Sequence, residues 1–201
     1  MPTTLLLARH AAHAEFGRVL SGRGDAAGLG TEGRAQAMRL ARRLGRERPA
    51  ALHASPRRRA IETATLLGKA LGLAVVAEPA LDEIDFGAWT GRTFGELEQD
   101  PAWRSWNEQR GTACPPDGEP MHEALSRALR WTGTLPANHP DAVVLAVSHA
   151  DVIKAVLLAH LGASLDAHWR IEIGAASLSV LELWPGGGRV RFMNETPAGD
   201  D

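Results

Sequence analysis

Short apolar runs alternate along the chain with longer segments in which apolar residues recur every three or four positions. Runs of strand length predict β-strands at 3–8, 51–54, 75–77 and 142–147. The run at 142–147, AVVLAV, is apolar throughout, which is typical of a strand buried on both faces of a parallel sheet. Near the end of the chain, the segments 177–184 and 189–193 flank PGGG and predict a hairpin-like pair.

The segments with helical periodicity lie between these runs, at 31–48, 56–71, 121–135 and 151–161. Thr31 is expected to cap the first helix and Pro49 to end it. Pro56 is expected near the start of the second, with Gly72 just past its end. Strands that alternate with helices predict an α/β fold with a mostly parallel sheet, to which the hairpin adds an antiparallel appendage.

Residues 82–120 form the longest stretch without periodicity, and they are rich in Gly and Pro. Trp89, Trp103 and Trp106 lie in it and are expected to pack in a core or subdomain, and a lid over the strand ends is the alternative for Trp103 and Trp106. The chain shows no internal repeat and no linker, and its 201 residues match the size of one domain. We therefore expect a single domain over 1–201, with an irregular, lid-like insertion at about 84–120.

Composition narrows the function classes. With 22 basic and 24 acidic side chains, the net charge of −2 argues against a nucleic-acid binder with a broad basic field. The apolar runs are too short for a signal peptide or a membrane span. Cys114 is the one cysteine and has no partner for an internal disulfide, which favours a reducing, cytoplasmic location.

Candidate chemistry gathers where three predicted strands end. Arg9-His10 follows the first strand, Ser55 leads into the arginine triplet 57–59, and Ser148-His149 follows the strand at 142–147. Ligands bind at the carboxyl ends of strands in open α/β sheets, and the first turn of a helix favours an anion. Arg9 beside His10 is expected to keep that imidazole neutral, as a nucleophile requires. Forked cations and neutral imidazoles together predict a phosphate site.

Four short segments carry a family resemblance: RH at 9–10, SPRRRAIETA at 55–64, LDEIDFGAWTG at 81–91 and AVSHADVIK at 146–154. In this order and spacing they resemble the histidine phosphatase superfamily, in its phosphoglycerate mutase-like branch, from Thr3 to about Glu195. The resemblance implies a three-layer α/β/α fold with a mostly parallel central sheet plus an antiparallel strand.

The resemblance also implies roles for single residues. His10 falls on the catalytic nucleophile that becomes phosphohistidine, and Arg9 and Arg59 fall on the clamp that binds the phosphate. His149 falls on the second catalytic histidine, which binds the phosphoryl oxygens and stabilises the transition state. Glu83 falls on the catalytic acid and base.

Two of these assignments depend on the register of the motif. Asp82 and Asp85 are competing carboxylates, and only the motif separates them from Glu83. In the arginine triplet, the pattern S-x-x-x-R selects Arg59 and leaves Arg57 and Arg58 as surface residues.

The sequence departs from the family pattern around both histidines. Ala11 and Ala150 stand where the family usually has glycine, and Ala12 and His13 replace its Glu-Thr or Glu-Ser. Phe16 replaces an asparagine that usually contacts phosphate, so one donor is missing or replaced.

Substrate-binding candidates are Ser21, Gly22 and His122. Ser21-Gly22 matches a substrate-contacting Thr/Ser-Gly pair with a shift of one residue, and His122 follows a loop that often faces the substrate in the family. A zinc site made of His10, His13 and His149 is the weaker alternative, because it lacks the helical HExxH context and a nearby carboxylate.

The resemblance implies a metal-independent phosphomonoesterase that acts on a small phosphorylated metabolite without a cofactor. Two alternatives stay open: a phosphoglycerate mutase-type phosphotransferase, and a catalytically weak protein that binds phosphorylated ligands in a regulatory role. The expected partner is a small phosphorylated substrate, with neither nucleic acid nor membrane. A homodimer is compatible with the sequence, and the oligomeric state stays open.

Overall fold

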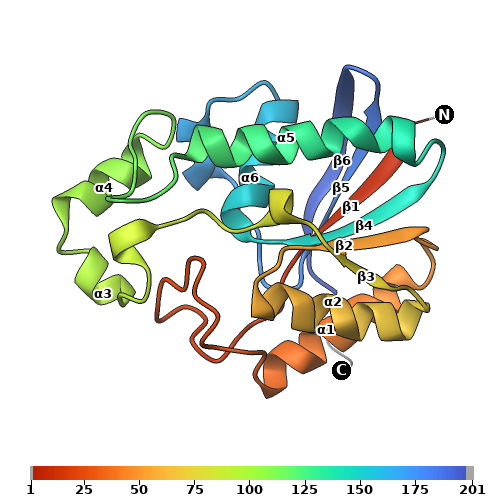
Figure 1. Ribbon diagram of the computed structural model, residues 1–201, viewed down its shortest axis with the longest axis horizontal. Helices are drawn as coiled ribbons and strands as arrows, with labels where there is room; N and C mark the ends of the chain where they lie inside the picture. The colour runs from red at the N-terminus through yellow and green to blue at the C-terminus, as the bar shows by residue number, and fades with distance from the viewer. Residues whose placement is uncertain (1, 198–201) are drawn as a thin grey trace.

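The computed structural model describes residues 2–197, and it has one six-stranded sheet at its centre (Figure 1). The strands lie in the order β3-β2-β4-β1-β5-β6. Their bounds are β1 Thr3–Arg9, β2 Ala51–Ala54, β3 Val75–Ala77, β4 Val143–Ser148, β5 Leu178–Trp184 and β6 Gly187–Glu195. Strands β3, β2, β4 and β1 pair in parallel, whereas β5 pairs antiparallel with both β1 and β6. The predicted α/β fold, with its mostly parallel sheet and antiparallel appendage, is confirmed.

Helices cover both faces of this sheet, which makes three layers (Figure 1). One face is covered by α1 (Thr31–Leu44) and α2 (Arg58–Leu71), and the other by α5 (Met121–Asn138) and α6 (Ala150–His160). The long segment between β3 and α5 carries α3 (Phe94–Leu97) and α4 (Pro101–Glu108), which lie beyond the end of the sheet at the left of Figure 1. Short 3₁₀-helices are η1 (Pro79–Leu81), η2 (Gly87–Trp89) and η3 (Leu165–Arg170).

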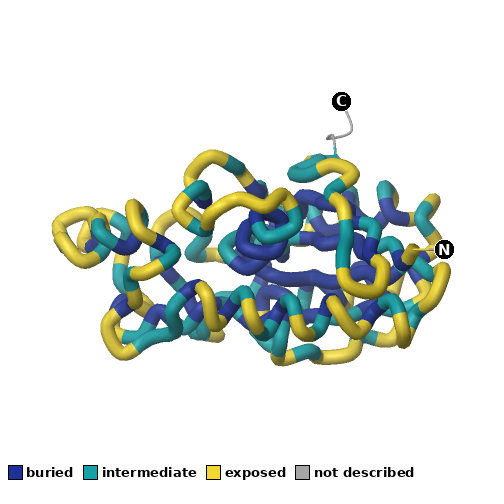
Figure 2. The backbone as a smooth tube through the Cα atoms, turned by 90° about the horizontal axis from the view of Figure 1, so that it is seen from above, coloured by how far each residue is buried: buried dark blue, intermediate teal, exposed yellow. Residues whose placement is uncertain are grey.

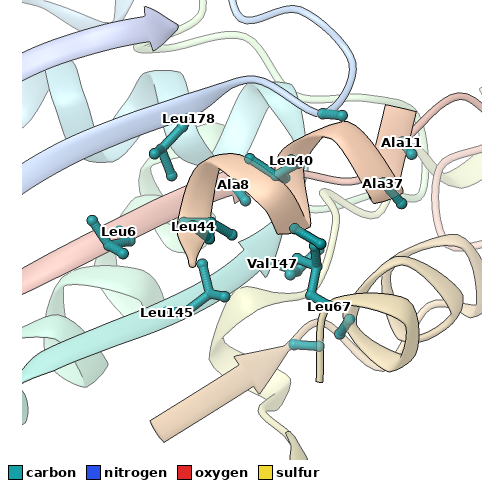
Figure 3. Packing of buried hydrophobic residues seen from close by; sticks show 14 of the residues in the cluster. Leu6, Ala8, Ala11, Ala37, Leu40, Leu44, Leu67, Leu145, Val147 and Leu178 are labelled. Carbon is teal, nitrogen blue, oxygen red and sulfur yellow. The ribbon is translucent and has the colours of Figure 1, made fainter. Parts of the chain in front are cut away.

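Strand β1 serves two cores at once. Leu6 and Ala8 pack toward α1 and α2, whereas Leu5 and Leu7 pack toward α5 and α6, because successive side chains of a strand point to opposite faces. The buried residues run through the centre of the molecule, inside an exposed outer layer (Figure 2). Figure 3 shows the first of the two cores, with side chains of α1 and α2 meeting the sheet at Leu40, Leu44 and Leu67.

A third, aromatic core lies within the segment between β3 and α5. The rings of Trp89 and Trp103 meet edge to face with centroids 5.2 Å apart, and Trp106 meets Phe86 edge to face at 6.2 Å. Trp89 and Trp106 are fully buried. This packing gives the segment a core of its own, so it is short helices on an aromatic cluster rather than extended loop.

Three boundaries of helices α1 and α2 differ from the sequence prediction. The first helix ends at Leu44 and not at residue 48, because the Gly45 N–H already closes on the carbonyls of Ala41 and Arg42. Its N-cap is Gly30, not Thr31. The second helix begins at Arg58, so Pro56 lies before it and not in its first turn.

None of the helices within residues 2–197 combines the length and the apolar character needed to cross a membrane.

Candidate active site

The site lies at the carboxyl ends of three neighbouring strands, in the sheet order β2-β4-β1. His10 directly follows β1, His149 directly follows β4, and Arg59 lies in the first turn of α2 after β2. The backbone links two of these positions, since the N–H of His10 donates to the carbonyl of Ser148 at 2.9 Å. The sheet therefore brings together residues that lie far apart in the sequence.

Arg59 lies between the two histidines. Its Nε donates to Nε2 of His10 at 3.3 Å, and its Nη2 lies 3.1 Å from Nδ1 of His149. The same guanidinium donates to the carbonyls of Gly22 at 2.7 Å and Gly24 at 3.2 Å. Its side chain is almost completely buried. Arg59 is thus fixed in place by four partners, with both imidazoles facing it.

These contacts determine the tautomer of His10. Its Nδ1 lies 2.9 Å from the carbonyl oxygen of Ala11, which can only accept a hydrogen bond, so Nδ1 carries the proton. Arg59 can only donate, so the opposite nitrogen, Nε2, carries no proton, and its lone pair accepts the hydrogen bond from Arg59. A neutral imidazole with a bare Nε2 that faces a cation is equipped to attack an electrophilic phosphorus.

Burial and positive charge keep both histidines neutral. Burial first, and then the Arg59 and Arg9 guanidinium groups, hold the pKa of His10 well below its usual value. Burial and Arg59 do the same for the pKa of His149. Arg9 was expected to keep His10 neutral; the direction is right, but burial and Arg59 contribute more to the lowered pKa.

Arg9 is the last residue of β1 and directly precedes His10. Its Nη1 donates to the carbonyl of Ile173 at 2.6 Å, and its guanidinium carbon lies 4.8 Å from the centre of the Phe16 ring. Its Nε is buried and has no hydrogen-bond partner among the described residues. An unpaired, buried cationic donor beside His10 is suited to bind an anion.

The three neighbouring carboxylates have different surroundings. Asp82 accepts from Ser55 and forms an ion pair with Arg57, and Asp85 accepts from the N–H of Gly87. Glu83 alone faces the histidines: its Oε2 lies 3.5 Å from Nδ1 of His149 and 3.7 Å from Nη2 of Arg59. The geometry therefore supports the register that selects Glu83.

Glu83 is held by its backbone and has a raised pKa. Arg23 and Arg127 both donate to its carbonyl oxygen, and both also bind the carboxylate of Glu119. Burial, with a further contribution from the negative charge of Asp151, raises the pKa of Glu83 to about 7. A carboxyl group with this pKa can both give and take a proton near neutral pH.

A cavity of about 90 Å³ opens onto these groups. Arg9, His10, Arg59 and Glu83 line it, and so do the substrate-binding candidates Ser21 and Gly22. The Ser21 hydroxyl is buried without a hydrogen-bond partner in the described part of the chain. Gly22 has a φ of +47°, and a Cβ there would lie 2.8 Å from Oγ1 of Thr90, so only glycine fits.

Other candidate residues lie elsewhere. His122 is exposed in the first turn of α5 and does not line the cavity, so its predicted role has no structural support. Arg58 is exposed and paired with Glu62, as a surface residue should be, whereas Arg57 is partly buried and paired with Asp82 and Asp25. A wider groove of about 610 Å³ opens at Trp103 and Trp169, but it contains none of the proposed catalytic groups.

Three aromatic residues shape the mouth of the cavity, and none of them is a predicted substrate-binding residue. They are His13, Phe16 and Phe94. The His13 ring lies 5.7 Å from that of His10 and 5.8 Å from that of Phe16. Burial and the Arg59 charge lower the pKa of His13 to about 4, so it adds no positive charge at neutral pH. Phe16, where the family has asparagine, covers Arg9 with its ring.

The sequence prediction missed a largely buried charge cluster at the start of α6. Asp151 accepts from Arg110 at 3.1 Å and from Nε2 of His168 at 2.8 Å. Burial opposes the charge of Asp151, but Arg110 and His168 hold the pKa of the carboxyl well below its usual value. The three residues come from separate elements, so no local pattern could have identified them.

Ala11, which stands where the family usually has glycine, is accommodated in the core. Ala11 is fully buried among the residues that pack on α1 and α2, and its N–H donates to Oγ1 of Thr63 at 3.0 Å. The next residue, Ala12, instead needs a glycine opposite it, because a Cβ on Gly33 would lie 1.9 Å from the Ala12 carbonyl oxygen. Helix α1 can therefore press against the loop after His10.

Within residues 2–197, no group of three or more His, Cys, Asp or Glu side chains is arranged to hold a metal ion. The zinc alternative thus lacks a ligand set in this geometry.

Comparisons with known proteins agree with this geometry. A family model described as "Histidine phosphatase superfamily (branch 1)" matches residues 5–196. The "Bifunctional protein Rv2228c" of Mycobacterium tuberculosis is 38% identical over 202 residues, which cover 97% of this chain and 54% of that protein. The chain thus spans about half the length of this relative.

Two further relatives carry phosphatase names. "Phosphoserine phosphatase 1" of Hydrogenobacter thermophilus is 31% identical over 157 residues, which cover 77% of this chain and 74% of that protein. Among solved structures, mycobacterial glucosyl-3-phosphoglycerate phosphatase Rv2419c with VO3 aligns with a TM-score of 0.85 and 28% identity, over 96% of this chain and 98% of that one.

Proposed function

The chain belongs to the histidine phosphatase superfamily, branch 1, and we propose on this basis that it is a metal-independent phosphomonoesterase that works through a phosphohistidine. One observation carries the proposal: the bare Nε2 of a neutral His10 faces Arg59 beside a cavity that Glu83 also lines. That arrangement combines a nucleophile, a phosphate clamp and a proton donor within one small space.

In the first step, Nε2 of His10 attacks phosphorus in line with the leaving oxygen. The P–N bond forms as the P–O ester bond breaks, and protonated Glu83 gives its proton to the leaving oxygen. Arg9 and Arg59 donate to the equatorial oxygens, where negative charge gathers in the transition state. The phosphate displaces Arg59 from the lone pair of His10, so the clamp and the nucleophile become free together.

In the second step, Glu83, now a carboxylate, takes a proton from water. The water oxygen bonds to phosphorus as the P–N bond breaks, and His10 returns to its neutral state. Glu83 ends protonated again, so one carboxyl serves as acid and then as base. Its pKa of about 7 suits both tasks near neutral pH.

The substrate is proposed only as a class, a small phosphorylated metabolite. The names of the relatives point to phosphoserine and to glucosyl-3-phosphoglycerate as substrates of those proteins. These names support hydrolysis over the phosphoglycerate mutase alternative and do not select one substrate. The cytoplasmic location and the homodimer stay predictions.

The test is turnover of p-nitrophenyl phosphate in EDTA by the wild-type protein and by His10→Ala. The proposal expects release of p-nitrophenol by the wild type and loss of nearly all of it in the variant. Wild-type turnover that survives His10→Ala, or that needs an added metal, would overturn it. A wild type that binds phosphate but releases no product would favour the regulatory alternative, and isomerisation of 3-phosphoglycerate with a 2,3-bisphosphate primer would favour the mutase.

A further inference from the structure

The far nitrogen of His149 contacts a buried serine. Nε2 of His149 lies 2.7 Å from Oγ of Ser55, and both residues are completely buried. On the near side, Arg59 can only donate to Nδ1 of His149. Nδ1 of the neutral ring is therefore bare, and the proton on Nε2 points at Ser55. His149 and His10 thus hold opposite tautomers, and both bare nitrogens face Arg59.

The other hydrogen bonds of the Ser55 hydroxyl orient it to accept the proton of His149 Nε2. It donates to Oδ1 of Asp82 at 3.3 Å, since a carboxylate can only accept, and it accepts from the N–H of Arg57 at 3.2 Å. Its remaining lone pair accepts the Nε2 proton of His149. The hydroxyl has one donor and two acceptor sites, all of which are used, so it cannot donate to His149 without giving up Asp82.

Asp82 is itself held in place. Its Oδ1 lies 2.9 Å from Nε of Arg57 and accepts the N–H of Glu83 at 2.8 Å, and its Oδ2 lies 3.7 Å from Nε of Arg23. The carboxylate thus connects the chain at Glu83 with the hydroxyl that orients His149. Asp82, the first carboxylate of the LDE motif, does not line the cavity, and this contact gives it a role.

We propose that Ser55 and Asp82 are positioning residues for phosphoryl transfer, and that they fix the tautomer of His149 and support its charged form. The proposal rests on the proposed function. When the substrate binds as its monoanion, the proton on its phosphoryl oxygen passes to the unprotonated Nδ1 of His149. The imidazolium so formed donates back to that oxygen, with its Nε2 proton still held by Ser55. The dianionic phosphate then offsets the burial that otherwise keeps this ring neutral. The negative charge of Asp82 then reaches that imidazolium through the hydroxyl.

The first test reads the tautomer directly and needs no turnover. In ¹⁵N spectra of protein labelled at histidine, His149 is assigned by the signal that His149→Gln removes. Wild-type His149 should show a protonated Nε2 and a bare Nδ1. Ser55→Ala should lose this pure state and give mixed tautomers, whereas Ser148→Ala should keep it. Ser148 is an equally buried serine beside His149, but its hydroxyl donates to Leu81. A protonated Nδ1 in the wild type, or an unchanged tautomer in Ser55→Ala, would overturn the proposal.

The second test asks whether Ser55 acts through His149. Ser55→Ala should lower kcat for p-nitrophenyl phosphate about 10- to 100-fold, as loss of a hydrogen bond to a charged group does. In a His149→Gln background the same change should cost less than about twofold, because its target is gone. Equal losses in both backgrounds would show a merely structural role, as is expected of Ser148→Ala. Thermal melts of every variant confirm that each one folds.

The two tests separate the inference from the function on which it rests. If the wild type fails to turn over any phosphate ester while the ¹⁵N spectra show the expected tautomer, the proposed function fails and the tautomer assignment stands. If turnover depends on His10 while Ser55→Ala leaves the ring of His149 unchanged, the function stands and the roles of Ser55 and Asp82 are refuted.

Discussion

The Nε of Arg59 lies 3.3 Å from the Nε2 of His10, so the proposed phosphate clamp rests on the lone pair of the proposed nucleophile. The same guanidinium reaches His149 with its Nη2 at 3.1 Å. Without substrate, each imidazole is capped by a cation that is itself buried. An incoming phosphate therefore replaces His10 as a hydrogen-bond partner of Arg59, and this leaves the lone pair of His10 Nε2 able to attack.

This relationship predicts that Arg59→Lys is severely impaired. Lysine keeps the charge but lacks the planar fork that contacts both histidines and the carbonyls of Gly22 and Gly24. We expect kcat/KM for an aryl phosphate to fall about 100-fold. The matched control is Arg58→Lys, one position earlier in α2, where the side chain is exposed and pairs with Glu62. Similar losses in the two variants would contradict the central place of Arg59.

A second prediction concerns Glu83 as the acid. Glu83→Gln cannot protonate the leaving oxygen, so kcat/KM should fall most for alkyl phosphates and least for aryl phosphates with acidic leaving groups. The value of kcat/KM depends only on the steps up to and including transfer of the phosphoryl group to His10, so it isolates the first half of the reaction. Asp85→Asn serves as the control, because the contacts of the Asp85 carboxylate within residues 2–197 are with the N–H of Gly87 and with Arg23, not with a histidine. Uniform slowing across the leaving-group series would argue against the acid role.

A third prediction is that Asp151 helps to set the pKa of Glu83. Its negative charge is one of the causes that raise the pKa of Glu83 to about 7. Asp151→Asn removes the charge, so Glu83 should lose its proton at lower pH, and the alkaline limb of kcat/KM should move toward lower pH. Both proteins are assayed with one substrate, so the ionisation of the substrate cancels. An alkaline limb that stays in place, or that moves to higher pH, would show that Asp151 does not act on Glu83.

The raised pKa of Glu83 also has a cost in stability. In the unfolded chain the carboxyl loses its proton near its ordinary value of 4.5, whereas in the folded protein it keeps the proton to about 7. The protonated Glu83 therefore contributes to the free energy of unfolding. This contribution is fully present below about pH 4.5 and is lost as the pH rises through about 7. Glu83→Gln should therefore be more stable than the wild type at pH 8, by on the order of 3 kcal/mol at most, and by less than about 1 kcal/mol at pH 5. Urea melts at the two pH values measure the difference; Glu123→Gln, at an exposed carboxylate on α5, should show none.

Gly33 offers a test of packing next to the nucleophile. A Cβ at this position would lie 1.9 Å from the carbonyl oxygen of Ala12, which is backbone and cannot yield easily. Gly33→Ala should lower the free energy of unfolding by about 2 kcal/mol or more, and it should also lower activity by moving the loop after His10. Gly133→Ala is the matched control in helix α5: nothing lies within 4 Å of its Cβ position, so alanine should stabilise it by up to about 1 kcal/mol. A stable, fully active Gly33→Ala would refute the close approach.

The parts of the site that could be predicted from sequence are those that lie at strand ends. Apolar runs locate the ends of β1, β2 and β4, and parallel strands bring those ends to one edge of the sheet. The strand ends were therefore enough to group Arg9, His10 and His149 with the arginine triplet 57–59, and the family pattern was needed to select Arg59. The order and pairing of the strands, by contrast, belong to the fold as a whole and not to any one motif.

Other features depend on contacts between distant elements. Nothing local separates Glu83 from Asp82, because the distinction comes from what each one meets: His149 in one case, and Ser55 and Arg57 in the other. The cluster of Arg110, Asp151 and His168 has the same origin. Helix α1 was predicted too long because Pro49 was expected to end it, whereas the helix ends at Leu44 with Gly45 as its C-cap.

The order of strands has a consequence for how the protein becomes active during synthesis. Arg9 ends β1 and Arg59 lies in α2, which follows β2, so the two arginines of the proposed phosphate clamp belong to strands that never pair with each other. Strand β4 lies between them and begins only at Val143. A nascent chain that ends before this strand already contains Arg9, His10, Arg59 and Glu83, yet it lacks the strand that sets their spacing. Such long-range pairing forms late, since loop closure costs entropy before contacts repay it. The proposed hydrolytic activity should therefore appear only after β4 has been synthesised, and a nascent chain that lacks this strand should not act on phosphate esters.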